Sequence, residues 1–294
     1  MGKMTSGEAA TKRRLLKVST GNDLSALADT DFVIEAIIED LQLKRKMFAE
    51  LEKVVSPQTV IATNTSSFLP SDLAAELQHK ERFCAVHVFN PVHKMQLIEV
   101  AATPGSSPET VAKALALAKA IGKTPVLLDQ ECPGLIVNRV LVTGMAWALD
   151  QLQTLKIDPW KIDAAMEKFG MEMGPFKTLD LVGFDIGYHV TKVMMSYYPQ
   201  DYPKAVADIP INKYKDLLGK KTGKGFYIWK DEKAVKPNKS ILEKFGWKIE
   251  CSSDDDVKAA RNMLLLSMTR EAQKIVTTGV CKSSDMVDLS LILG

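Results

Sequence analysis

Short apolar runs alternate with amphipathic stretches up to residue 131, and this alternation constrains the fold more than any other feature of the chain. Apolar runs bounded by turn residues predict buried strands, and apolar residues three to four apart predict helices. Strands are expected at residues 32–37, 58–63, 82–89, 94–102 and 124–128, and helices at 41–55, 72–78 (with Ser71 as N-cap) and 108–121. Strand–helix alternation predicts a largely parallel sheet covered on both faces.

The pattern changes at Cys132-Pro133-Gly134, where a Pro-Gly step marks a domain boundary. Strands are expected to cease there, with helix following helix from Asn138. A second boundary is expected near residue 230, after a turn segment rich in glycine and lysine and before a polar stretch. The expected units are residues 1–131, 132–230 and 231–294. A faint repeat relates helical hairpins at 137–170 and 260–294, either by duplication or because two helical hairpins resemble each other.

Charge and cysteine content exclude several classes of protein. Lys and Arg total 38 against 36 Asp and Glu, so the net charge of +2 argues against a nucleic-acid partner. The four cysteines form no CxxC motif, which argues against a zinc ribbon or a redox dithiol, and their small number weakly favours a reducing compartment. They are Cys84, Cys132, Cys251 and Cys281. No metal site is expected. No apolar run approaches the length of a membrane span, and the polar N-terminus from Met1 has no secretory core.

The strongest candidate for chemistry is the pair His87 and Glu99. The two residues lie in consecutive predicted strands and are equidistant from residue 93. If those strands pair antiparallel about that turn, the two residues face each other across about 5 Å. An imidazole beside a carboxylate is poised to act as a base. The alternative is a core histidine satisfied by any acceptor.

Three further places carry polar side chains where ligands of open α/β sheets bind. The segment 64–67 (Asn-Thr-Ser-Ser) follows a buried strand and can hydrogen-bond a substrate oxygen or a ribose, or form a polar turn. Glu39 ends another strand with Lys44 a helical turn further on, and the alternative is a capping carboxylate with a solvated lysine. Asn138 lies in the first turns of the helix between the domains, as a substrate ligand or a packing residue.

The usual dinucleotide signature is absent. A nucleotide-binding sheet normally opens with strand–GxGxxG–helix, but Gly2, Gly7 and Gly21 do not form that pattern, and no P-loop is present. Either the sheet binds no dinucleotide, or the chain is a fragment that lacks its first βαβ unit.

Several motifs together resemble the L-3-hydroxyacyl-CoA dehydrogenase family. They are His87-Val-Phe-Asn90-Pro91 through Glu99-Val, Val33-Ile-Glu-Ala with Glu39, Asn64-Thr-Ser-Ser, Pro133-Gly-Leu-Ile-Val-Asn138-Arg139, Met173-Gly-Pro with Asp180-Leu-Val-Gly-Phe-Asp185, and Gly219-Lys-Lys-Thr-Gly-Lys-Gly-Phe-Tyr227. The resemblance covers roughly residues 15–294. It is strongest to the dehydrogenase part of the multifunctional α subunit of fatty-acid oxidation complexes.

The resemblance implies an α/β Rossmann-type NAD domain without its first βαβ unit, an all-α C-terminal domain and a partial second copy of that domain. It implies oxidation of (S)-3-hydroxyacyl-CoA to 3-ketoacyl-CoA with NAD in fatty-acid β-oxidation. His87 would be the general base and Glu99 its orienting partner, while Ser66 and Asn138 would hold the 3-oxygen. The positions matching cofactor contacts are Glu39, Lys44, Ser66, Asn90 and Lys221.

The resemblance also implies an acyl-CoA substrate, a homodimer or a complex with a thiolase subunit, and a location in the cytoplasm or an organelle matrix, mitochondrial or peroxisomal. The chain departs from the family in lacking its glycine-rich loop, its ribose-binding acid and most of its CoA-binding helical hairpin. We therefore expect weak NADH binding, turnover that is slight or absent, and an open sheet edge beside the strand at 32–37.

Two alternatives to this function remain. One is a non-catalytic truncated relative with a structural or assembly role. The other is a different NAD-dependent 3-hydroxyacid dehydrogenase; that class uses a lysine base, so the His87–Glu99 pair argues against it.

Overall fold

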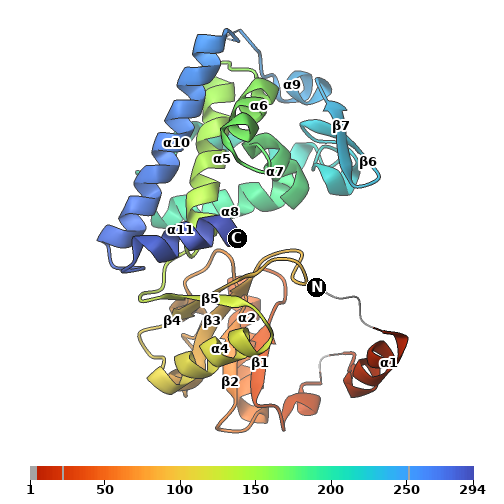
Figure 1. Cartoon of the computed structure of the whole chain (residues 1–294), viewed down its shortest axis with the longest axis vertical. Helices are drawn as coiled ribbons and strands as arrows, with labels where there is room; N and C mark the ends of the chain where they lie inside the picture. The colour runs from red at the N-terminus through yellow and green to blue at the C-terminus, as the bar shows by residue number, and fades with distance from the viewer. Residues whose placement is uncertain (1–4, 22, 251) are drawn as a thin grey trace.

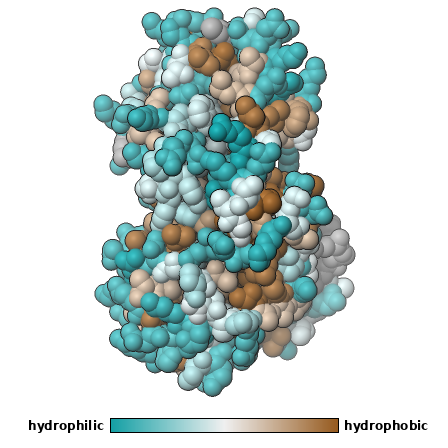
Figure 2. Space-filling model, turned by 90° about the vertical axis from the view of Figure 1, so that its left-hand side faces the viewer, coloured by the Kyte–Doolittle hydropathy of each residue, from teal (hydrophilic) through white to brown (hydrophobic). Residues whose placement is uncertain are grey.

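A computed structural model describes residues 5–21, 23–250 and 252–294. Met1, Gly2 and Cys251, which entered the sequence interpretation, lie outside these ranges. The molecule has a sheet-containing lobe and a helical lobe, stacked along its long axis (Figure 1). Figure 2 shows a waist between the lobes and a mostly hydrophilic surface on the face it presents.

The first lobe is built on a five-stranded sheet. Its strands are β1 (Phe32–Glu35), β2 (Val60–Thr63), β3 (Phe83–Val88), β4 (Leu97–Ala102) and β5 (Thr124–Leu128), in the order β1-β2-β3-β4-β5. All neighbours are parallel except β3 and β4, which are antiparallel. The predicted largely parallel sheet is therefore confirmed, and the antiparallel pair is the one that carries His87 and Glu99.

Alternation along the strands sends side chains to two different cores. Ile61 and Phe83 pack with Phe48 and Leu51 of α2 (Leu41–Val54) and with α3 (Pro70–Leu73). Their chain neighbours, such as Ala62 and Cys84, face the alanines of α4 (Pro108–Ala120) instead. Helices therefore cover both faces, as expected for strands without a polar face. α1 (Ser6–Leu15) precedes the sheet and buries none of its residues.

The short helix after β2 differs from its prediction. It begins at Pro70 rather than after Ser71, and it ends at Leu73 rather than at residue 78. Proline suits the first helical position because its fixed φ is already helical and its missing N–H has no partner there. Ser71 is not the N-cap, and its backbone N–H instead donates to the Glu131 carboxylate, 2.7 Å away.

Seven helices of the described chain form the second lobe. They are α5 (Val137–Thr154), α6 (Pro159–Phe169), α7 (Pro175–Val182), α8 (Phe184–Tyr197), α9 (Ser240–Phe245), α10 (Asp254–Thr277) and α11 (Ser284–Leu293). Their core gathers Phe176, Phe184 and Phe226, and it continues across residue 230 to Ile241 and Leu264. A second copy of the helical domain stays a prediction.

The prediction that strands cease after the first lobe is wrong at one place. β6 (Tyr227–Lys230) and β7 (Lys233–Pro237) form an antiparallel hairpin where a polar stretch was expected. Its two-residue turn, Asp231-Glu232, has positive φ at both positions, as a type I′ hairpin turn requires. The turn lacks the usual Asn-Gly or Asp-Gly pair, so the sequence does not reveal it.

A fourth apolar cluster joins the two lobes. It contains Ala85, Leu97 and Val126 from the sheet together with Val137 of α5 and Val287 of α11. The lower end of α5 therefore meets the sheet beside β4 (Figure 1). At the opposite side of the sheet, β1 is an edge strand with no further strand paired to it in the described chain, as the sequence predicted.

Candidate active site

His87 and Glu99 are directly hydrogen-bonded. They occupy paired positions in the β3–β4 register, and His87 Nδ1 lies 2.8 Å from Glu99 Oε2. Both side chains are buried, with exposed fractions of 6% and 0%. The spatial relationship predicted from the turn between the two strands is therefore present.

The other oxygen of Glu99 reaches the helical lobe. Glu99 Oε1 accepts hydrogen bonds from the backbone N–H groups of Ile136 and Val137, each at 3.0 Å. These are two of the free N–H groups at the start of α5 (Figure 1), where the helix dipole also favours negative charge. One carboxylate thus connects His87, the sheet and the first turn of α5.

This arrangement selects a tautomer of His87. An ionised carboxylate only accepts hydrogen bonds, so the hydrogen of the neutral ring lies on Nδ1. Nε2 then keeps its lone pair and can accept a proton. The ring of Phe89 packs edge-on against the imidazole, with centroids 4.5 Å apart, and limits its orientation. The Nε2 atom of His87 is therefore held in one position where it can accept a proton, with a fixed counter-charge beside the ring.

The segment after β2 packs against the end of β1. Asn64 Oδ1 accepts the backbone N–H of Val88 at 2.9 Å, which fixes this segment beside the end of β3. Thr65 Oγ1, the N–H of Ser66 and Ser67 Oγ all donate to Glu39 Oε1. Ser66 lies half-buried between its two neighbours, which are buried.

Glu39 is held in its ionised form. Burial disfavours its charge, but hydrogen bonds from Thr65, Lys44 and Ser67 outweigh that effect, so its pKa lies below the usual value. Lys44 Nζ lies 2.9 Å from Glu39 and 2.7 Å from Glu35. The reading of Lys44 as a solvated lysine is wrong, because its side chain is only 1% exposed. Lys44 positions Glu39, whose side chain is 23% exposed.

Glu35 is a member of this network that sequence reasoning missed. Its second oxygen accepts from Thr63 Oγ1 at 2.7 Å, and its first from the N–H of Ile37 and from Lys44. Glu35 ends β1 within an apolar run. A charged residue in such a run was the available signal, since buried carboxylates require a cationic or N–H partner.

The remaining predicted site residues divide between the lobes. Asn138 is half-buried in the first turn of α5, next to the N–H group that binds Glu99. Asn90 is exposed in the turn after β3. Lys221 lies in the turn before β6 and forms an ion pair with Asp185 of α8. No described contact brings Lys221 to the other predicted residues.

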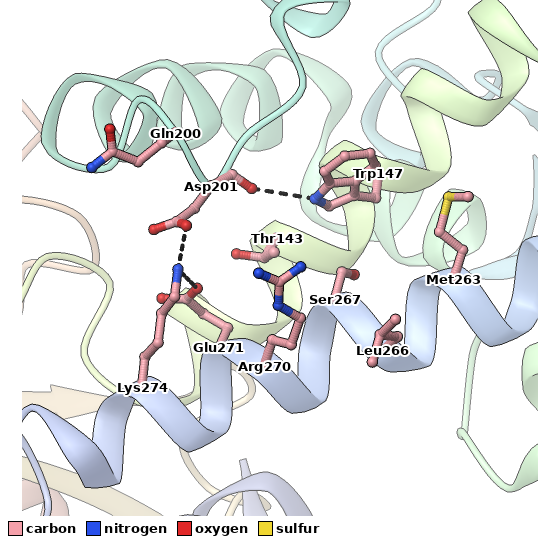
Figure 3. A pocket seen from close by; sticks show the side chains of 10 residues that line it. All are labelled: Thr143, Trp147, Gln200, Asp201, Met263, Leu266, Ser267, Arg270, Glu271 and Lys274. Carbon is pink, nitrogen blue, oxygen red and sulfur yellow. Dashed lines mark hydrogen bonds and ion pairs between the residues drawn. The ribbon is translucent and has the colours of Figure 1, made fainter.

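A hollow lies away from these residues, between α5, the segment after α8 and α10 (Figure 3). Its volume is about 240 Å³. The backbone carbonyl of Asp201 accepts a hydrogen bond from Trp147 Nε1, and the carboxylate of Asp201 pairs with Lys274 (Figure 3). Lys274 Nζ also lies 3.5 Å from the Glu271 carboxylate. Glu271 is buried and pairs with Arg139 of α5 at 2.6 Å. All the charged side chains in Figure 3 except Arg270 are paired with an opposite charge of the same chain. The hollow therefore presents few free groups for binding or catalysis.

The described residues contain no cluster of histidine, cysteine and carboxylate side chains that could hold a metal ion. Nor does any helix of the described chain have the length and apolar character needed to cross a membrane.

The polar groups at the ends of β1 and β2 fit part of a dinucleotide. Glu39 presents a partly exposed, ionised carboxylate that can accept from ribose or carboxamide donors. Ser66 and Asn90 add a hydroxyl and an amide near the same edge of the sheet. These groups suit the nicotinamide and its ribose, whereas none of the 17 glycines forms a GxGxxG loop for the diphosphate.

Comparison with known proteins assigns both lobes of the chain to one enzyme family. Residues 1–132 match the NAD binding domain of 3-hydroxyacyl-CoA dehydrogenase, and residues 134–229 match the C-terminal domain of the same enzyme. A solved (S)-3-hydroxybutyryl-CoA dehydrogenase, PaaH1 from Ralstonia eutropha, is 31% identical, with a TM-score of 0.70, over 78% of this chain and 80% of that one.

Two further solved structures align along almost the whole chain. The 3-hydroxybutyryl-CoA dehydrogenase from Escherichia coli K12 is 26% identical, with a TM-score of 0.76, over 100% of this chain and 77% of that one. The dehydrogenase part of multifunctional enzyme 1 from C. elegans is 25% identical, with a TM-score of 0.59, over 99% of this chain and 66% of that one. The chain belongs to the 3-hydroxyacyl-CoA dehydrogenase family of NAD-dependent oxidoreductases.

Proposed function

We propose that this chain oxidises (S)-3-hydroxyacyl-CoA to 3-ketoacyl-CoA with NAD, in fatty-acid β-oxidation. The observation that carries the proposal is the His87–Glu99 pair, buried and tied through Glu99 to the first turn of α5. This geometry supports a single base at the junction of the two lobes.

His87 removes the proton of the 3-hydroxyl group through Nε2 while hydride leaves C3. Bound NAD supplies the acceptor for that hydride. The imidazolium that forms is stabilised by the Glu99 carboxylate, which has no other cation within reach among the described ion pairs. In the reverse direction, His87 returns the proton to the oxygen as hydride reaches C3.

Ser66 and Asn138 hold the 3-oxygen in this proposal. Ser66 follows β2, and Asn138 lies one residue after Val137, whose N–H binds Glu99. No described hydrogen bond uses the Ser66 hydroxyl or the Asn138 amide, so both groups are available to a ligand. Glu39, Ser66 and Asn90 form the nicotinamide side of the site, with Lys44 behind Glu39. A contact from Lys221 requires a rearrangement of its pair with Asp185.

The names of the similar structures support the substrate class. Two of them are 3-hydroxybutyryl-CoA dehydrogenases, and a third is part of a multifunctional enzyme. An acyl-CoA substrate, a homodimer or thiolase-containing complex, and a cytoplasmic or organelle-matrix location belong to the same proposal.

Oxidation of the two enantiomers of 3-hydroxybutyryl-CoA tests it. NADH formation should be slow but measurable at high NAD with the (S) enantiomer, and it should be far slower with the (R) enantiomer and with free 3-hydroxybutyrate. Asn138→Ala should reduce the rate, whereas Asn262→Ala, an exposed residue of α10, should not. Absence of NADH formation at every NAD concentration would favour the structural role instead.

A further inference from the structure

A second hollow lies in the helical lobe and has a different character from the charged one in Figure 3. It lies between α5, α6, α7 and α10, and four of its lining residues are methionines: Met145, Met166, Met171 and Met268. Thr178 is the single hydroxyl of the lining, and it already donates to the carbonyl of Gly174 at 2.9 Å. No charged residue lines this pocket.

The methionine pocket and the candidate active site share the helix α5. Leu141 and Met145 line the pocket, and they follow Asn138 by three and seven positions. This spacing places the three residues on one side of the helix. With a rise of 1.5 Å per residue, Met145 lies about 10 Å beyond Asn138 along the helix axis. A substrate whose 3-oxygen meets Asn138 has its apolar end within reach of the pocket.

We propose that the methionine pocket receives the alkyl tail of a 3-hydroxyacyl-CoA, and that its methionines set the chain length the site accepts. The inference rests on the proposed function, because Asn138 is its starting point. A lining without charge or free hydrogen-bonding groups fits a saturated hydrocarbon and disfavours polar ligands.

The pocket is nearly closed in this structure. Its free volume is about 20 Å³, room for little more than one water-sized group. A longer tail therefore enters only if methionine side chains move aside, which their unbranched and flexible chains allow. Gly144 contributes to this adaptable wall, because a Cβ there would lie 2.9 Å from Met268 Sδ. The site should therefore accept tails of several lengths, up to the limit set by the methionines.

Met171 is the position at which to test this inference. It is half-buried in the segment between α6 and α7, outside any helix, so its substitution disturbs the core less than that of Met166. Met171→Trp fills the pocket and Met171→Ala enlarges it. Met263→Trp is the matched control, because Met263 lines the charged hollow on the other side of α10.

The experiment is calorimetric titration of the full chain with acetoacetyl-CoA, 3-ketooctanoyl-CoA and 3-ketododecanoyl-CoA. For the unaltered chain, affinity should rise from acetoacetyl to 3-ketooctanoyl by about fourfold for each methylene buried. Met171→Trp should abolish that rise and leave acetoacetyl-CoA binding unchanged. Met171→Ala should move the highest affinity towards 3-ketododecanoyl-CoA. The control, Met263→Trp, should bind all three ligands as the unaltered chain does. Melting curves identify any variant that does not fold.

The outcomes separate the two claims. If Met171→Trp and Met171→Ala both keep the chain-length dependence of the unaltered chain, the pocket does not hold the tail and the inference is wrong. If acetoacetyl-CoA neither binds nor is reduced, the proposed function itself fails, and the inference fails with it.

Discussion

Glu99 has no exposed surface, and each of its two oxygens has a separate partner. One accepts from His87 Nδ1, and the other accepts from two backbone N–H groups at the start of α5. A buried carboxylate without such partners would be strongly destabilising. The candidate base therefore has its tautomer, its orientation and its counter-charge supplied by one residue.

Glu99→Gln should remove activity without disturbing the fold. The two N–H groups of α5 need an acceptor, so the glutamine oxygen faces them and its NH2 group donates to His87 Nδ1. The imidazole hydrogen then lies on Nε2, which is the wrong tautomer for a base. We expect kcat to fall by roughly 10²–10⁴-fold. Steady-state kinetics with melting curves check this, with the exposed Glu81→Gln as the control. A kcat near that of the unaltered chain would contradict the role of Glu99.

Lys44 is the second residue whose burial has a measurable consequence. It lies between Glu35 and Glu39, so Lys44→Met leaves two carboxylates without their cation. Breaking a buried pair in this way costs about 3–5 kcal/mol. Lys113→Met, which breaks an exposed pair with Glu109, should cost less than about 1 kcal/mol. Urea unfolding of the two variants measures the difference, and equal effects would show that the buried network contributes little.

Sequence reasoning predicts residue pairs within one turn or hairpin and misses most others. The His87–Glu99 contact follows from equal spacing about one turn, once the two strands are assumed to pair antiparallel. The contact of Glu99 with α5 joins residues nearly forty positions apart, and no local pattern encodes it. Lys44 illustrates the same limit, because its burial depends on how α2 packs against β1 and β2.

At the scale of elements, buried aspartates organise the helical lobe. Asp163 of α6 accepts the backbone N–H groups of Phe176 and Lys177, at the start of α7, and the hydroxyl of Tyr227. Asp180 of α7 similarly binds Phe226 and Trp229 beside the hairpin. The sequence motifs include Asp180, but no local pattern predicts these contacts. Each aspartate fixes the start of an element that follows it in the chain.

The pH dependence of stability should reveal Asp163. Burial raises its pKa to about 7, against the opposing effect of its hydrogen bonds. An aspartate of the unfolded chain titrates near pH 4. Between roughly pH 4 and pH 7 the folded state therefore binds more protons, so the stability that this group contributes below pH 4 is lost as the pH rises to 7.

The advantage in Tm of the unaltered chain over Asp163→Asn should consequently shrink between pH 5 and pH 8. Melting curves of both chains at each pH provide the measurement, and Asp285→Asn on the exposed side of α11 is the control. An advantage that grows with pH would mean that hydrogen bonding, rather than burial, dominates the pKa of Asp163.

At the scale of the whole molecule, the sequence predicts the type of secondary structure in each lobe but not the contacts between the two lobes. Strand–helix alternation predicts the parallel sheet because buried strands and amphipathic helices have different periods. The β6–β7 hairpin escapes prediction because its turn uses Asp231 and Glu232 instead of glycine. The contact between the lobes depends on the Glu99 carboxylate and on one apolar cluster, both formed from segments far apart in the sequence.

NADH binding should reflect the composition of the sheet lobe. A dinucleotide is held chiefly at its diphosphate by glycine-loop N–H groups and a helix N-terminus, and the sequence contains no GxGxxG. The described site offers mainly Glu39, Ser66 and Asn90, which we propose for the nicotinamide side. We expect the 294-residue chain to bind NADH more weakly than micromolar in calorimetric titration. Micromolar or tighter binding would show that another segment supplies the phosphate site.

The most direct test of the account is the effect of His87→Gln on acetoacetyl-CoA reduction at saturating NADH. His93 is the matched control, because it is an exposed histidine in the turn between the same two strands. We expect His87→Gln to lower kcat by roughly 10²–10⁴-fold with little change in acetoacetyl-CoA binding. His93→Gln should leave both kcat and binding unchanged. A His87→Gln chain with the kcat of the unaltered protein would contradict the assignment of His87 as the base.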